Sequence, residues 1–167
     1  MYDKLTESDI RKMQDEINHR KLVVRKEAIE AIKEARAQGD LSENFEYYAA
    51  KRDKNKNEGR IRYLENMIKT ATVVKDESAS DEVGLNNTVE VEFEDDGMIE
   101  KYRIVTTLRG NSLKNLISID SPIGKALMGH RAGDRVKVQV NEKVSYYLII
   151  KNIEKTTDES EDEIKSF

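Results

Sequence analysis

The sequence contains no cysteine, no tryptophan and one proline, Pro122. The lack of cysteine excludes disulfide bonds and thiolate metal sites within these residues. No apolar run approaches the roughly 18 residues of a membrane-spanning helix. The first ten residues, MYDKLTESDI, lack the apolar core of a signal peptide. We therefore expect a soluble, cytoplasmic protein that makes no membrane contact.

Charged residues make up 37% of the chain, yet the net charge is only −4. A surface with a large positive excess, which dominates non-specific affinity for nucleic acid, is therefore excluded. Any contact with nucleic acid should be local. Long helices with solvated faces explain so polar a composition.

The composition changes near residue 75. Residues 7–74 contain no proline and one cluster of turn formers, at 38–40, whereas residues 86–154 hold alternating apolar runs and five of the eight glycines. This change predicts a helical coiled-coil domain at 1–75, a linker at 76–85 and a second domain at 86–155. The acidic residues 156–167 are predicted to be a disordered tail.

Apolar residues in the first half recur at helical spacings of three, four and seven. They are Ile10, Met13, Ile17, Val24, Ala28, Ala31 and Ala35, then Tyr47, Ala50, Ile61, Leu64, Ile68 and Ala71. The same phase includes Lys54 and Asn57, which predicts a polar layer. A connection of only two or three residues would make the helices antiparallel. Each helix would have about 30 residues and a length of roughly 45 Å.

The second half shows period-two alternation, which is typical of strands. Strands are predicted at 87–95, 99–107, 115–120, 134–140 and 145–154, and a short helix at 121–129, which opens with Ser-Pro and closes with glycine. The predicted fold class is α+β, with an antiparallel two-helix coiled coil followed by a small antiparallel sheet domain with one helix.

The connection between the helices carries QGDLSENFEYY, residues 38–48. Gly39 fits the left-handed position after a helix. Asp40 and Glu43 fit the N-cap and N3 positions of a capping box. The same two carboxylates, at the end of a long arm, are also suited to Mg²⁺, which prefers oxygen ligands. They would form half of a metal site, which a partner has to complete. The two interpretations are compatible.

Three segments resemble the bacterial Gre transcript-cleavage factors. They are ARAQGDLSENFEYYAAK at 35–51, EGRIRYLENMI at 58–68 and LISIDSPIGKALMGHRAGDRVKV at 116–138, within a resemblance that spans residues 5–154. It implies a C-terminal domain similar to FKBP. It also implies a protein that enters the secondary channel of bacterial RNA polymerase and stimulates cleavage of backtracked RNA. The polymerase performs the hydrolysis, so the factor is not an enzyme by itself.

The resemblance also implies roles for particular residues. Asp40 and Glu43 would help the polymerase hold a second Mg²⁺, and Ser42 would support them. Arg36, Lys51 and Arg52 match positions that contact the 3′ end of the nascent RNA. Asp120, Ser121 and Pro122 match the segment that grips the polymerase β′ subunit near the channel, and the factor is expected to act as a monomer.

Plainer interpretations remain for these residues. The basic residues also fit a solvated helix face, and Ser121-Pro122 also fits a simple helix start. Phe45 replaces a small residue of the family, and KRDKNKNE at 51–58 is unusually basic. These departures leave open a channel-binding regulator that inhibits polymerase without cleavage. A prolyl isomerase is disfavoured by the few aromatic residues of the second half, and a plain coiled-coil adaptor does not explain the acidic tip.

Overall fold

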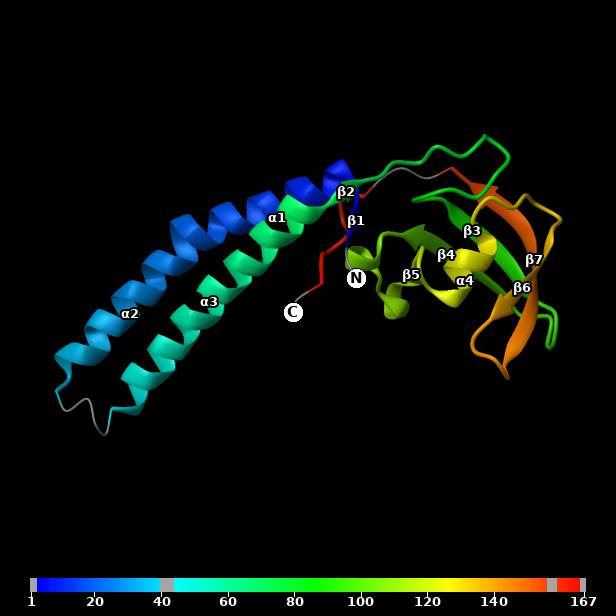
Figure 1. Ribbon diagram of the computed structural model, residues 1–167. Coiled ribbons are helices and arrows are strands. Elements are labelled where there is room, and N and C mark those ends of the chain that lie inside the picture. The colour runs from blue at the N-terminus through cyan, green and yellow to red at the C-terminus, as the bar shows by residue number, and fades with distance from the viewer. Residues whose placement is uncertain (1–2, 40–43, 156–158, 166–167) are drawn as a thin grey trace. The chain divides into compact units, whose positions relative to one another are not determined.

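The computed structural model describes residues 3–39, 44–155 and 159–165. The chain divides into two compact units, each drawn in Figure 1. The helical unit comprises Ile10–Ala71, and the sheet unit comprises Met1–Asp9 together with Thr72–Ser166. This division differs from the predicted boundary near residue 75, because the first residues of the chain belong to the same unit as the sheet.

The helical unit contains two long helical segments. The first consists of α1 (Glu7–His19), a π-helical turn η1 (Arg20–Val24) and α2 (Arg25–Ala37), and the second is α3 (Phe45–Thr70). His19, Val24 and Arg25 all keep right-handed helical dihedrals, so the first segment is continuous. None of the helices in the described ranges combines the length and apolarity needed to traverse a bilayer.

Polar contacts join the two segments in antiparallel order. The paired residues are Glu16 with Arg60, Arg20 with Asn57, Lys21 with Glu65 and Arg25 with Glu58. Of the predicted apolar positions, the buried ones are Met13, Ile17, Ala35, Ala50, Ile61 and Leu64. Ala31 is exposed, and its neighbour Ile32 is half-buried in its place. The helix pair is therefore present, with six of the thirteen predicted apolar positions buried.

The predicted polar layer coincides with the π-helical turn. Asn57 is only 2% exposed, and its Nδ2 donates to the Arg20 carbonyl at 3.2 Å while its Oδ1 accepts from Arg20 Nη1 at 3.1 Å. The same carbonyl accepts the N–H of Arg25. The buried amide is thus satisfied by a backbone group at the widened turn, which offsets the cost of burying it.

Glu16 lies between two arginines of the hairpin. It accepts hydrogen bonds from Arg60 Nε and Arg20 Nε, each at 2.7 Å. Burial alone raises the pKa of Glu16, but the two arginines outweigh it and hold the pKa below its usual value. A lowered carboxyl pKa stabilises the folded state above the unfolded pKa of about 4.3, and this stability is lost as the pH falls through the folded pKa.

The hairpin should therefore lose stability in acid, and Glu16→Gln should remove part of this dependence. We expect the variant to be less stable than the wild type near neutral pH, and the difference to shrink below about pH 4. Urea denaturation followed by circular dichroism at several pH values measures it. Asp15→Asn, at the exposed neighbouring position, is the control. A difference between Glu16→Gln and the wild type that stays constant with pH would contradict the assignment.

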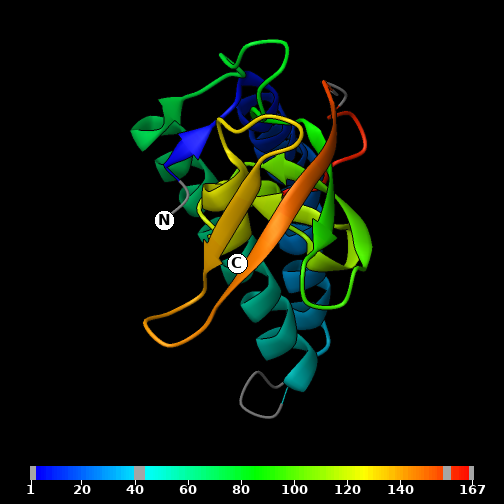
Figure 2. The ribbon, with the colours of Figure 1, turned by 90° about the vertical axis from the view of Figure 1, so that its right-hand side faces the viewer.

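The sheet unit is built on five strands in the order β5-β4-β3-β7-β6. They are β3 (Thr88–Phe93), β4 (Ile99–Val105), β5 (Leu116–Ser118), β6 (Arg135–Gln139) and β7 (Ser145–Glu154), and Figure 2 looks onto them. All five predicted strands are present, and so is the short helix, as α4 (Pro122–Leu127). The α+β class is confirmed, but the prediction of a purely antiparallel sheet is wrong, because β4 and β5 are parallel.

The prediction also missed a two-stranded parallel pair, β1 (Lys4–Leu5) with β2 (Thr72–Val73). This pair joins the beginning of the chain to the segment after α3. Two residues are too few for a period-two pattern, so neither strand carries a periodic signal.

A single apolar core fills the sheet unit. It consists of Val83, Val89, Val91, Ile104, Leu127, Val136, Val138, Leu148 and Ile150. Val83 lies within the predicted linker at 76–85, so that segment packs on the sheet instead of spanning open space. The described part of the predicted disordered tail also makes contacts, since Lys165 N–H donates to the Leu108 carbonyl at 3.0 Å.

Candidate functional site

The end of the helical hairpin is the connection between α2 and α3. Helix α2 ends at Ala37, Gly39 has φ +111°, and α3 begins at Phe45. The connection therefore runs over residues 38–44, longer than predicted. Gly39 takes the left-handed conformation expected of it. Asp40, Ser42 and Glu43 lie outside the described residues, so their placement stays a prediction.

The predicted capping box is wrong, because the N-cap of α3 is Asn44. Its Oδ1 accepts the N–H of Tyr47 at 3.0 Å, and its Nδ2 donates to the Ala35 carbonyl at 2.5 Å. One side chain thus caps α3 and ties it to the last turn of α2. Asn44 therefore occupies the capping position predicted for Asp40, and Asp40 and Glu43 both lie outside the described residues.

Asn44→Ala should destabilise the hairpin by about 1–2 kcal/mol, since it removes an N-cap and a bond between the helices. The expected result is faster amide hydrogen exchange in the first turn of α3 and the last turn of α2. Asn44→Asp is the informative companion variant, because it keeps the cap acceptor and loses the donor to Ala35. If Asn44→Ala exchanges like the wild type, the cap assignment fails.

The three residues predicted to contact RNA lie near this end. Arg36 lies over the ring of Tyr47, with its guanidinium carbon 5.6 Å from the ring centroid. The Arg36 guanidinium lowers the pKa of the Tyr47 hydroxyl, and Lys51 adds to the effect. Lys51 and Arg52 are exposed on α3. Arg36 is thus anchored across the hairpin by an aromatic ring, which favours a defined position over a freely solvated one.

Lys51 and Arg52 line a surface hollow on α3 that the sequence analysis did not anticipate. Its other lining residues are Tyr48, Asn55, Lys56 and Gly59. Tyr48 is 48% exposed, and Phe45, one turn earlier, is 85% exposed. The spacing of Phe45, Tyr48 and Arg52 by three and four residues was the available signal for this shared face. Basic groups interleaved with exposed aromatic rings suit a single-stranded nucleic acid.

The predicted docking segment lies in the sheet unit, where β5 leads into α4. Ser121 is the N-cap of α4: its Oγ accepts from the Gly124 N–H at 3.1 Å and donates to the Ser118 carbonyl at 2.6 Å. Pro122 occupies the first turn. The structural interpretation of Ser121-Pro122 as a helix start is therefore confirmed, and any docking role is additional.

Asp120 stands on the surface beside this cap. Its carboxylate accepts a hydrogen bond from Thr107 Oγ1 at 2.9 Å and lies 3.9 Å from Lys4 Nζ. Both members of the ion pair are about half exposed, so the pair adds little stability. Asp120 and Pro122 are thus held in place and accessible, as residues of a docking surface must be.

The remaining titratable groups do not form a metal site among the described residues. No group of three or more histidine, aspartate or glutamate side chains there is arranged to hold an ion. The proposed Mg²⁺ half-site rests on Asp40 and Glu43 alone, and both lie outside the described ranges.

Comparisons with known proteins agree over nearly the whole chain. Residues 4–73 match the family model "Transcription elongation factor, N-terminal", and residues 77–155 match "Transcription elongation factor, GreA/GreB, C-term". The chain is 45% identical over 136 residues to transcription elongation factor GreA of Bacillus licheniformis, covering 81% of this chain and 86% of that protein. It is 42% identical over 147 residues to GreA of Clostridium kluyveri, covering 87% and 92% respectively.

Among solved structures, the chain is similar to the transcription factor Gfh1. The identity is 27%, the match covers 92% of this chain and 97% of the other, and the TM-score is 0.43. This score is too low for the structural match to support a functional conclusion, so the family rests on the sequence matches.

Proposed function

Because the chain belongs to the GreA/GreB family of transcription elongation factors, we propose that it enters the secondary channel of bacterial RNA polymerase and stimulates cleavage of the 3′ end of backtracked RNA. The hydrolysis belongs to the polymerase, and the factor contributes groups to the polymerase active site. It acts in the cytoplasm, as a monomer, where the polymerase transcribes.

The observation that carries this proposal is the hairpin. Helix α3 runs over Phe45–Thr70, a length of roughly 39 Å at 1.5 Å per residue. Polar pairs such as Glu16–Arg60 and Arg25–Glu58 hold it antiparallel to the first helical segment. An arm of this length can carry the residues between its helices into a deep channel. Asn44 caps α3 at this end of the arm.

The acids of the connection carry the chemistry in this proposal. Asp40 and Glu43 provide carboxylate oxygens for a weakly held Mg²⁺ of the polymerase, and Ser42 supports them through its hydroxyl. The ion supplies charge stabilisation and water activation for phosphodiester cleavage. Carboxylates are the ligands that such a hard cation prefers, and a partner provides the rest of its shell.

The basic residues near the end of the hairpin bind the RNA in the same proposal. Arg36, Lys51 and Arg52 pair with phosphates of the extruded strand, and Tyr48 offers an exposed ring on which a base can stack. The attraction for RNA comes from these local groups, because the net charge of −4 gives no general attraction for nucleic acid. The sheet unit docks through Asp120, Ser121 and Pro122 on the β′ subunit near the channel entrance.

A second function remains, in which the chain binds the channel and inhibits without cleavage. One observation favours it: Phe45 is 85% exposed at the first position of α3. A bulky apolar side chain there would fill space that a nucleotide or RNA end needs.

Purified polymerase, halted in a backtracked complex with labelled RNA, distinguishes the two functions. With the protein and Mg²⁺ present, we expect short fragments bearing the RNA 3′ end, followed by renewed elongation when nucleotides are added. A complex without the protein is the control for intrinsic cleavage. Slower elongation with no fragments would instead establish the inhibitory function.

A further inference from the structure

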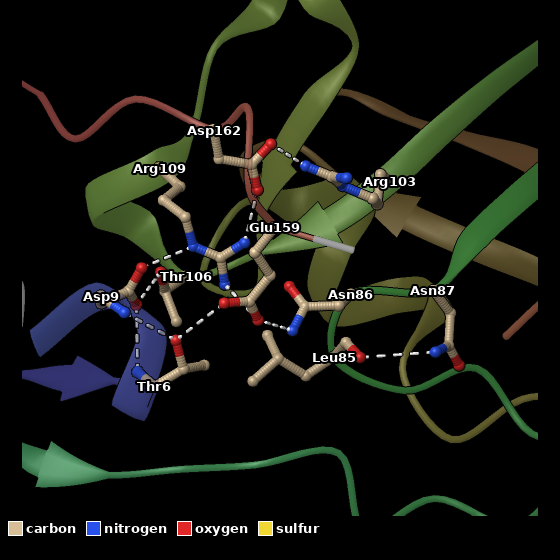
Figure 3. A network of polar contacts seen from close by, with 10 residues as sticks. All are labelled: Thr6, Asp9, Leu85, Asn86, Asn87, Arg103, Thr106, Arg109, Glu159 and Asp162. Carbon is tan, nitrogen blue, oxygen red and sulfur yellow. Dashed lines mark hydrogen bonds and ion pairs between the residues drawn. The ribbon is translucent and has the colours of Figure 1, made fainter. Parts of the chain in front are cut away.

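Arg109 is a fully buried cation held by acids from both ends of the chain. Its Nε donates to Asp9 Oδ1 at 2.6 Å, its Nη1 donates to Asp162 Oδ2 at 2.8 Å, and its Nη2 lies 3.5 Å from Glu159 Oε1. Figure 3 shows this arrangement, which lies entirely within the sheet unit. A guanidinium removed from water needs such anionic partners, because an uncompensated buried charge is strongly destabilising.

Asp9 is the partner of Arg109 from the beginning of the chain. It is also fully buried, and its Oδ2 accepts from Thr106 Oγ1 at 2.7 Å and from the Thr6 N–H at 3.0 Å. The Thr6 hydroxyl in turn accepts the Asp9 N–H at 3.1 Å. These bonds close the first turn of α1 around the arginine. Asp9 therefore both caps the start of the chain's first helix and neutralises one buried charge.

A second arginine lies next to Arg109, and one carboxylate cannot neutralise both positive charges. Arg103, on β4, donates to Asp162 Oδ1, so the Asp162 carboxylate bridges the two guanidinium groups. Glu159 accepts hydrogen bonds from Asn86 Nδ2 and from Thr6 Oγ1. The two cations thus meet Asp9 from the beginning of the chain and two further carboxylates from residues 159–162.

The local geometry of the acidic segment fits this role. The Asp162 N–H donates to the Glu159 carbonyl at 3.1 Å, a turn that brings two carboxylates three residues apart to the same side. The backbone is fixed again at Lys165, whose N–H bonds to the Leu108 carbonyl at 3.0 Å. Glu161 and Glu163, which alternate with these residues, are exposed. Only one side of the acidic segment engages the sheet unit.

We propose that Arg103 and Arg109, with Asn86 and Thr6, form a socket for a short acidic peptide with carboxylates three residues apart. Residues 159–165 occupy this socket in cis and fasten residues 6–9 to the rest of the sheet unit. These residues follow the last position matched by the family model, residue 155, and the proposed polymerase function makes no use of them. The socket is a separate binding element.

The first test uses the full-length chain with Glu159→Gln and Asp162→Asn together. The matched control is Glu161→Gln with Glu163→Gln, which removes the same charge from the exposed side of the segment. We expect the first pair to accelerate amide hydrogen exchange about tenfold or more in residues 4–9 and 159–165, because charge-assisted bonds to buried arginines are lost. The control pair should exchange like the wild type. Equal effects of the two pairs, or none, would overturn the proposal.

The second test asks whether the socket recognises the segment as a ligand. A fluorescent peptide with the sequence of residues 156–167 is titrated into the Glu159→Gln, Asp162→Asn chain and into the wild type. We expect binding to the variant, at least tenfold weaker binding to the wild type, and none by a peptide carrying the same two substitutions. A tethered segment has an effective concentration in the millimolar range. Failure of the acidic peptide to bind the variant up to about 1 mM would therefore contradict occupancy in cis.

Discussion

Replacing Asp40 by Asn, or Glu43 by Gln, should reduce stimulated transcript cleavage by about 100-fold or more. Mutating a group that only orients a metal ligand already lowers metal affinity by about 10–100-fold. The loss of a ligand carboxylate itself should have a larger effect. Affinity for polymerase should stay within about twofold, because the residues proposed to dock, Asp120, Ser121 and Pro122, belong to the sheet unit. The measurements are single-turnover cleavage rates on backtracked complexes and a competition binding assay.

The matched control is Glu46→Gln, which removes one negative charge from an exposed position in the first turn of α3. It should cleave like the wild type. Circular dichroism of all three variants should match the wild type, since Asn44 caps α3. Loss of helix content in Asp40→Asn would restore the capping interpretation, and equal loss of cleavage in Glu46→Gln would show that only general charge matters.

Gly124→Ala should strongly destabilise the sheet unit. A Cβ at this position of α4 would lie 2.0 Å from the Ser118 carbonyl oxygen and 3.1 Å from the Ile119 Cα. Both are backbone atoms, so β5 and the Ser121 cap would have to shift. We expect a loss of about 3 kcal/mol in the free energy of unfolding of this unit. Hydrogen exchange of the core strands β3 and β7 measures it.

Lys125→Ala, at the exposed neighbouring position of α4, is the control and should be nearly neutral. Because Gly124 sets the path of residues 118–122, Gly124→Ala should also weaken polymerase binding if Asp120 and Pro122 form the docking surface. Wild-type binding by a clearly destabilised Gly124→Ala chain would argue that docking does not depend on this segment.

The five strands β3 to β7 and helix α4 were predictable because each carries its own local pattern. Alternation in TVEVEF and RVKVQ marks strands, and Ser-Pro marks the start of α4. The parallel pairing of β5 was not predictable, since it depends on the path between β4 and β5. That path includes Asn115 with φ 55° and two short 3₁₀ turns.

The sequence indicates which residues belong to the candidate site, but it does not determine which of them caps α3 or how the nearby chain is paired. Asp40 and Asn44 are both good N-cap residues, and local propensity could not choose between them. The π-helical turn left no periodic signal apart from the polar position Asn57. The acidic composition predicts a disordered tail at the end of the chain, because the partners of Asp162 are Arg103 and Arg109, more than 50 residues earlier in the sequence.

The central claim is that Asp40 and Glu43 supply ligands for a weakly held Mg²⁺ of the polymerase. The most direct measurement is the cleavage rate of a backtracked complex as a function of Mg²⁺ concentration, with the wild-type protein, with Asp40→Asn and with no factor. We expect half-maximal cleavage at a Mg²⁺ concentration about tenfold or more lower with the wild type than without factor, and no such shift with Asp40→Asn. The same Mg²⁺ dependence in all three reactions would contradict it.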